Sequence, residues 1–136
     1  MGVITILGDG RSGLAIAGAL PDERARKQAY RSVIFSGVTV LVLKSIIGKR
    51  RPPGPIEYNP FTLDGNYHSF PSGHTSTSFA LATTIATHYP EYRRHAYSVA
   101  SLVGISRLFV DAHWLTDVIA GAGLGYASAR FVEYRW

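Results

Sequence analysis

Residues 32–48 read SVIFSGVTVLVLKSIIG, an almost unbroken apolar run that contains one cation, Lys44, near its end. The run has many β-branched side chains, but its length of about 17 residues favours a helix over a strand. A helix that crosses a membrane needs roughly 20 residues, with a range of about 17 to 25. The run is therefore a candidate membrane span, and the alternative is a buried helix of a soluble bundle.

Four further apolar segments are predicted to be helices, at residues 10–20, 73–89, 97–110 and 114–132. The stretch between residues 49 and 71 is rich in proline and glycine, which is typical of a loop. We therefore predict one all-α domain over residues 1–136, an integral-membrane bundle of four to five helices. The first segment is short, which leaves open that an N-terminal span is missing.

The composition points toward lipid and away from nucleic acid. Charged residues make up 17% of the chain, against about 25% in soluble domains. Mean hydropathy is only +0.08, so we expect the polar residues to be concentrated in an active site and in the turns. The longest basic run, residues 49–51, is followed at once by two prolines, and the chain has no cysteine. No disulfide and no thiolate metal site is possible.

The basic residues sort onto two sides if the segments alternate in direction. One side receives Arg24, Arg26, Lys27, Arg31, Arg93, Arg94, Arg130 and Arg135. The other side receives Arg11, Lys44, Lys49, Arg50, Arg51 and Arg107. The first set is predicted to be cytoplasmic by the positive-inside rule. The bias becomes stronger if Lys44, Arg51 and Arg107 bind substrate and so do not count as topology signals.

Three polar clusters lie at segment ends on one predicted side of the bundle. They are Lys44 to Pro52, Pro71 to His74 and Ser106 to Asp117. Lys44 and Arg107 lie inside apolar runs, where a charge is expensive and by default suggests function. With Arg51 they make a set of cations that needs an anion, and guanidinium groups match phosphate oxygens. For Lys44 alone, snorkelling of the side chain to the interface is the alternative.

The second cluster, Pro71-Ser72-Gly73-His74, opens the segment at residues 73–89. Ser72 is a favourable N-cap, and Gly73 allows a ligand to approach the backbone. The N–H groups at a helix start form an anion site, beside which His74 is placed to give a proton to a leaving oxygen. The alternative is an ordinary capped helix start.

The third cluster contains His113 and Asp117, four residues apart and therefore on one face of a helix. A carboxylate bonded to one ring nitrogen fixes the tautomer and raises the basicity of the other, as in an activated nucleophile or base. A structural pair and a metal site are the alternatives, but the nearby cations would repel a divalent ion. Asp111 is interpreted as a local cap or a partner of His113. Spacing alone leaves open which histidine is the nucleophile.

Together the clusters resemble the three motifs of the type 2 phosphatidic acid phosphatase superfamily. Those motifs are Lys-x6-Arg-Pro, Pro-Ser-Gly-His and Ser-Arg-x5-His-x3-Asp, and the sequence matches every fixed position of all three. The resemblance covers residues 32–132. It implies that His113 attacks phosphorus to form a phosphohistidine, that Asp117 orients His113 and that His74 protonates the leaving oxygen. It assigns the phosphoryl oxygens to Lys44, Arg51, Ser72, Gly73 and Arg107.

The resemblance further implies a metal-independent phosphatase that acts on a lipid phosphate or pyrophosphate. No cofactor or metal is expected, because fixed cations supply the electrostatic stabilisation. The expected partners are a phosphorylated lipid and the bilayer, with no nucleic acid. We expect a bacterial inner membrane protein whose site faces the periplasm or exterior, with the aromatic residues of the loop at residues 49–70 near the headgroups. These aromatic residues are Tyr58, Phe61, Tyr67 and Phe70.

Three alternatives remain open at this point. Two share the fold, a non-lipid phosphatase and a vanadate-dependent haloperoxidase. The third is a non-enzymatic membrane protein that binds anionic lipid, against which His74, His113 and Asp117 argue, because binding needs cations but no nucleophile. The lipid itself is also open, among undecaprenyl pyrophosphate, phosphatidylglycerophosphate, phosphatidic acid and a lipid A phosphate.

Overall fold

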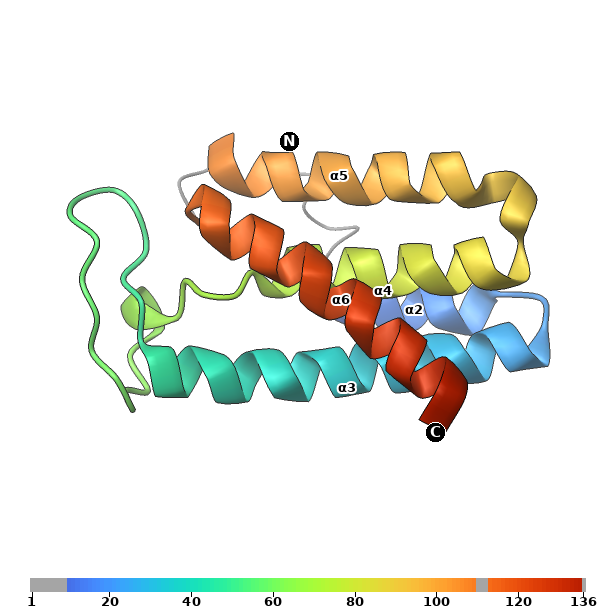
Figure 1. Cartoon of the computed structure of the whole chain (residues 1–136), viewed down its shortest axis with the longest axis horizontal. Coiled ribbons are helices and arrows are strands. Elements are labelled where there is room, and N and C mark those ends of the chain that lie inside the picture. The colour runs from blue at the N-terminus through green and yellow to red at the C-terminus, as the bar shows by residue number, and fades with distance from the viewer. Residues whose placement is uncertain (1–9, 110–112, 136) are drawn as a thin grey trace.

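The computed structural model describes residues 10–109 and 113–135, and this part of the chain is all-α, as the sequence predicted (Figure 1). The α-helices are α2 (Gly10–Ala19), α3 (Glu23–Ile47), α4 (Gly73–His88), α5 (Arg93–Phe109) and α6 (Leu115–Arg135). Two short 3-10 helices, η1 (Gly65–Tyr67) and η2 (Pro90–Tyr92), lie in the connections. The structure confirms the predicted helical segments and the loop between residues 49 and 71, although two helices begin earlier than predicted.

Helix α3 begins at Glu23, nine residues before the apolar run on which its prediction rested. Asp22 caps it, because its carboxylate accepts a hydrogen bond from the Ala25 N–H at 3.2 Å. Glu23 then pairs with Lys27 one turn later at 3.1 Å. The charged stretch was assigned to a turn because of its many charged residues, although it also contains the buried Ala25 and Ala29. It consists of good helix formers, and it adds about two and a half polar turns before the apolar run.

Helix α5 begins at Arg93 rather than at residue 97. Pro90 stops α4 and starts η2, whose last residue leads directly into α5. The connection between α4 and α5 is therefore only a few residues long, which holds these two helices antiparallel and adjacent (Figure 1).

Helix α4 lies at the centre of the bundle and contacts α3, α5, α6 and α2. Its closest neighbour is α6, which crosses it obliquely (Figure 1). Two glycines of α6 permit this approach, since a Cβ at Gly121 or Gly125 would run into backbone carbonyl oxygens of α4, those of Ser72 and Ser76. The start of α6 is thereby fixed against the start of α4.

The interior of the bundle holds many small polar side chains, while its outer surface is apolar. Helix α4 buries a run of hydroxyl residues, Thr75, Ser76, Thr77, Ser78, Thr83 and Thr84. The outer face of α3 exposes Ile34, Val38, Leu41, Val42 and Ile46 at helical spacing. Small residues at helix contacts are characteristic of membrane bundles, where lipid rather than water covers the outside.

Among the described helices, α3 is the one whose length and composition would let it cross a membrane, with a mean hydropathy of 1.5 over its best window. Helices α4 and α5 have 16 and 17 residues and α6 has 21. Their buried residues include Ser, Thr and Gly, which lowers their mean hydropathy.

The loop between α3 and α4 folds back on itself at the end of the bundle where α3 ends and α4 begins (Figure 1). Gly48 turns the chain with a left-handed φ of +61°, and its N–H donates to the Lys44 carbonyl. Backbone bonds then join Arg50 to Glu57 at 2.8 Å and Ser69 to Lys49 at 3.0 Å. Of the aromatic residues expected near lipid headgroups, Tyr58 and Phe61 are exposed, whereas Tyr67 and Phe70 are half-buried.

The close crossing of α4 and α6 yields a first prediction. Gly125→Ala should lower the free energy of unfolding by about 1–3 kcal/mol, because the added methyl group meets the Ser76 carbonyl and the Ala80 N–H. Gly123→Ala in the same helix meets nothing within 4 Å, so it should be neutral or stabilise by up to about 1 kcal/mol through helix propensity. Thermal denaturation in detergent compares the two, and equal melting temperatures would contradict the crossing.

Candidate active site

The three polar clusters meet at one end of the bundle, as the sequence predicted. Lys44 lies in the last turn of α3, Ser72 and Gly73 start α4, Arg107 lies in the last turn of α5, and Asp117 lies in the first turn of α6. His113 lies just before α6 and is buried, with 4% of its surface exposed. Antiparallel neighbours place these ends together, because α3 and α5 end where α4 and α6 begin (Figure 1).

Contacts tie the clusters to one another. The Ser72 N–H donates to the Asp117 carbonyl at 3.0 Å, which joins the second cluster to the third. Gly73 lies against Lys44, since a Cβ built on it would be 4.0 Å from the Lys44 Cε. Arg51 Nη1 lies 3.4 Å from Nε2 of His113, which joins the first cluster to the third.

The imidazole of His113 is held by a backbone carbonyl. Its Nδ1 lies 2.6 Å from the carbonyl oxygen of Ser69. A carbonyl oxygen can only accept a hydrogen bond, so Nδ1 must carry the proton. Nε2 then carries the lone pair in the neutral ring, and it faces Arg51. Nε2 is therefore unprotonated, and its lone pair accepts a hydrogen bond from Arg51 Nη1.

This geometry corrects one part of the sequence analysis. The Asp117 carboxylate was expected to bond to a ring nitrogen and fix the tautomer, but its Oδ2 lies 3.7 Å from Nδ1, beyond hydrogen-bond distance. The Ser69 carbonyl takes that position instead. Asp117 remains close enough for its charge to favour a positive charge on the ring.

Asp117 is fully buried, and its carboxylate is surrounded by donors. Lys49 Nζ lies 2.9 Å from Oδ1. The Trp114 N–H donates to Oδ2 at 2.7 Å, and the hydroxyl of Ser69 donates to the same oxygen. A buried carboxylate is stable only when it is paired and hydrogen-bonded, and these three donors supply that.

Lys49 and Ser69 were not among the predicted site residues. Lys49 lies in the variable part of the first motif, and Ser69 lies in the loop two residues before the second motif. Neither stands out in the sequence, because a lysine beside two arginines reads as a solvated basic run. The structure buries both side chains, with Lys49 5% and Ser69 0% exposed.

The cations Lys44, Arg51 and Arg107 line the same end of the bundle. Lys44 is buried, and its Nζ donates to the His68 carbonyl at 2.6 Å. The Nε atom of Arg107 is buried without a hydrogen-bond partner in the described structure. His68 contributes this carbonyl, while its ring faces the Thr62 carbonyl.

The start of α4 has the predicted capped geometry. The Ser72 hydroxyl accepts from the Thr75 N–H at 3.3 Å. The Ser72 N–H also bonds to Asp117, so its N–H and its hydroxyl both have partners within the protein. Its contact with phosphate stays a prediction. His74 lies half-buried in the first turn of α4, and its role as a proton donor likewise stays a prediction. Asp111 lies outside the described residues.

The surroundings of His113 lower the pKa of its imidazole below the ordinary value of 6.5. Burial is the main cause, and the positive charges of Lys44 and Arg51 act in the same direction. The Asp117 carboxylate and the Ser69 carbonyl oppose this shift without reversing it. His113 is therefore neutral at pH 7, the form that has a lone pair on Nε2.

Comparison with protein families and curated proteins gives consistent matches. The model of the PAP2 superfamily matches residues 28–136. A lipid A 1-phosphatase of Rhizobium etli is 37% identical over 101 residues, which cover 71% of this chain and 44% of the relative. A lipid A 1-phosphatase of Porphyromonas gingivalis is 47% identical over 107 residues, covering 75% of this chain and 23% of the relative. The chain spans less than half the length of these relatives.

A solved structure has the same fold. The crystal structure of Aquifex aeolicus LpxE superimposes with a TM-score of 0.81 over 96% of this chain and 81% of that chain. Sequence identity between the two is 22%, so the likeness concerns the arrangement of the helices.

The carboxylate network yields a second prediction. Asp117→Ala leaves the buried Lys49 ammonium without its anion, and should lower the free energy of unfolding by about 3–5 kcal/mol. Ser69→Ala removes one hydroxyl donor from the same carboxylate, and should lower it by about 1 kcal/mol. Denaturation of both variants in detergent tests the order. If Asp117→Ala were no less stable than Ser69→Ala, the ion pair would not support the fold.

Proposed function

The chain belongs to the PAP2 superfamily, whose model matches residues 28–136, and we propose that it is a metal-independent membrane phosphatase for a phosphorylated lipid. The observation that carries this proposal is the imidazole of His113. Its Nδ1 is held by the Ser69 carbonyl, and its Nε2 lies 3.4 Å from Arg51 Nη1. A neutral histidine so oriented beside a cation is arranged to attack a phosphoryl group.

In the proposed reaction the Nε2 lone pair of His113 forms a bond to phosphorus as the bond to the leaving oxygen breaks. His74 gives that oxygen a proton. Water, deprotonated by the same His74, then attacks phosphorus and breaks the N–P bond. Inorganic phosphate leaves, and His113 returns to its neutral form. The positive charge on the ring in the intermediate is favoured by the Asp117 carboxylate, 3.7 Å from Nδ1.

The cations Lys44, Arg51 and Arg107 are proposed to hold the phosphoryl oxygens. The buried Nε of Arg107 supports this assignment, because a buried guanidinium donor without a partner is costly and a phosphate oxygen would satisfy it. The N–H of Gly73 at the start of α4, which Ser72 caps, is proposed to add the partial positive charge of a helix N-terminus. These groups take the electrostatic role that a divalent metal has in other phosphatases.

The surface chemistry supports a lipid rather than a soluble substrate. The outer faces of α3 and α5 are apolar, and the polar residues are buried between the helices. The proposed location is a bacterial inner membrane with the active site facing the periplasm. Curated relatives named lipid A 1-phosphatase and phosphatidylglycerophosphatase B support a lipid substrate. A lipid A phosphate and phosphatidylglycerophosphate are therefore both among the substrates to be tested.

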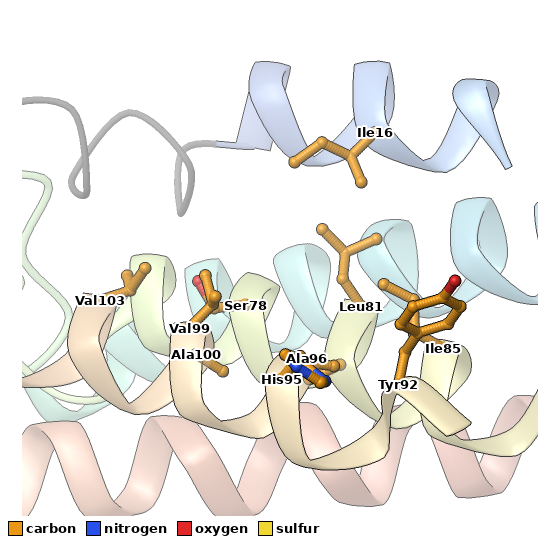
Figure 2. A pocket seen from close by; sticks show the side chains of 11 residues that line it. Ile16, Ser78, Leu81, Ile85, Tyr92, His95, Ala96, Val99, Ala100 and Val103 are labelled. Carbon is orange, nitrogen blue, oxygen red and sulfur yellow. The ribbon is translucent and has the colours of Figure 1, made fainter. Parts of the chain in front are cut away.

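An apolar groove of about 350 Å³ is proposed to take an acyl chain of that lipid (Figure 2). Helices α2, α4 and α5 form it, and Figure 2 shows Ile16 of α2 facing Leu81 and Ile85 of α4. At one end it reaches Ser78 and Val103. These residues are one turn from His74 and Arg107 on the same helix faces, so a chain in the groove would direct its headgroup toward the cations.

A third prediction tests the nucleophile. His113→Gln keeps a side-chain donor for the Ser69 carbonyl but has no nucleophilic nitrogen, so phosphate release should fall at least about 10³-fold. His88→Gln, at the opposite end of the bundle, should stay within about twofold of wild type. Release is measured with EDTA in detergent from phosphatidic acid, phosphatidylglycerophosphate, undecaprenyl pyrophosphate and a lipid A phosphate. Loss of wild-type activity in EDTA, or full activity of His113→Gln, would overturn the mechanism.

A fourth prediction tests the groove. Ala96→Trp fills it, and should raise KM at least about fivefold for a substrate with long acyl chains. The same variant should leave kcat/KM for a dihexanoyl analogue within about twofold, because short chains do not need the groove. Ala127→Trp on the exposed face of α6 is the matched control. Equal effects of Ala96→Trp on long and short substrates would contradict the assignment.

A further inference from the structure

Lys49 has no role in the mechanism proposed above, yet its side chain is nearly as buried as that of Asp117. The side chains are 6% and 0% exposed. Lys49 occupies a variable position between the Lys44 and Arg51 of the first motif. A buried ammonium is costly unless it is paired and hydrogen-bonded, so its place in this site needs a reason.

The contacts of Lys49 fix its position from several sides. Its Nζ lies 2.9 Å from Asp117 Oδ1 and 2.8 Å from the Thr116 hydroxyl. The same ammonium lies 5.8 Å from the centre of the Phe70 ring and 6.0 Å from that of Trp114, distances at which an aromatic face attracts a cation. The Lys49 carbonyl also accepts from the Ser69 N–H at 3.0 Å.

These contacts connect Lys49 to the two groups at Nδ1 of His113, Ser69 and Asp117. Through its carbonyl it holds Ser69, whose own carbonyl bonds to Nδ1. Through its ammonium it holds Oδ1 of Asp117, which leaves Oδ2 for the Ser69 hydroxyl and the Trp114 N–H. In this arrangement Oδ2 stays 3.7 Å from Nδ1, outside hydrogen-bond distance.

We propose that Lys49 is a positioning residue for the phosphatase reaction. Its ammonium anchors Asp117 beside the Nδ1 edge of His113 and offsets part of the negative charge of that carboxylate. The inference rests on the proposed function. Lys49 does not reach the phosphate in this role; it acts through Asp117 and Ser69. Without this ammonium, the negative charge of Asp117 would favour the protonated His113 ring, which cannot attack phosphorus.

The sign of the pH effect follows from the charges that face His113. Lys44 of α3, Asp117 of α6 and Arg51 of the loop act on the ring directly, and Lys49 pairs with that Asp117. Arg107 of α5 acts on Lys44 and Arg51, and His74 lies in the first turn of α4. Neutralising Lys49 removes one positive charge and leaves the Asp117 carboxylate uncompensated. Both changes raise the pKa of His113. The acidic limb of the rate profile, which reports loss of the neutral ring, must then move to higher pH.

The test compares pH profiles of kcat/KM, which report the titration of the free enzyme, for wild type, Lys49→Met and Lys49→Arg on the best lipid of the panel. In wild type the acidic limb should lie below pH 6.5, because burial and the neighbouring cations lower the pKa of His113. Lys49→Met should move the limb up by about one pH unit, which lowers the rate at pH 7 by about threefold or less through protonation of the ring. Any loss beyond that reports misplacement of Asp117. Lys49→Arg keeps the charge, so the limb should stay and much of kcat/KM should return.

Arg50→Met is the matched control, because it removes the neighbouring cation, which pairs with Glu57 at the surface. Its profile should equal that of wild type. A Lys49→Met enzyme with an unmoved limb would overturn the inference, whether kcat/KM were normal or reduced, since a merely structural residue affects yield and melting temperature but not the limb. If Lys49→Met does not fold, Lys49→Gln, whose amide can still donate to Asp117, replaces it with the same expected shift.

The control arms separate this inference from the proposed function. Wild type without activity on any lipid would contradict the phosphatase. In that case Lys49 is tested by the His113 ring itself, whose protonation is followed by NMR in wild type and Lys49→Met. A ring pKa that does not rise in the variant would overturn the role of Lys49, and a rise of about one unit would support it without any turnover.

Discussion

The buried carboxylate of Asp117 is the interaction on which the active end of the bundle depends. Its side chain accepts from Lys49, Ser69 and Trp114, and its backbone carbonyl accepts from the N–H of Ser72. One residue therefore joins the first turn of α6, the start of α4 and the loop that follows α3. Because a buried charge is strongly destabilising when it loses its partner, these segments are held in one arrangement, and His113 is held with them.

The same logic explains why a bundle with an apolar outside has a polar inside. Where lipid covers the surface, burial of apolar side chains contributes little to helix association, and close packing with hydrogen bonds contributes more. The chain accordingly places Ser, Thr and Gly between α4 and its neighbours, and Val, Leu and Ile on the outer faces. The polar interior at one end then becomes the site, where cations gather around the neutral ring of His113.

Much of the fold could be predicted from the chain because helix-length apolar runs and a proline-rich loop are local features. The antiparallel order of the helices then brought Lys44, Ser72, Arg107 and Asp117 to one end. The start of α3 was misplaced because a charged stretch was taken for a turn, although a cap at Asp22 and an i,i+4 pair make it helical. The role of Ser69 could not be foreseen, since it depends on a backbone carbonyl that any residue could supply.

The sequence by itself determined the fold class, the family and the set of motif residues, since these follow from segment length, spacing and residue type. Only the tertiary structure decided which ring nitrogen of His113 is unprotonated. It also decided that the Ser69 carbonyl rather than Asp117 holds the other nitrogen, and that Lys49 is buried against Asp117. The physical reason is that these contacts join residues 44 and 68 positions apart in the chain. The distances between these residues are set by how the loop packs against the helix ends, and no local sequence pattern encodes them.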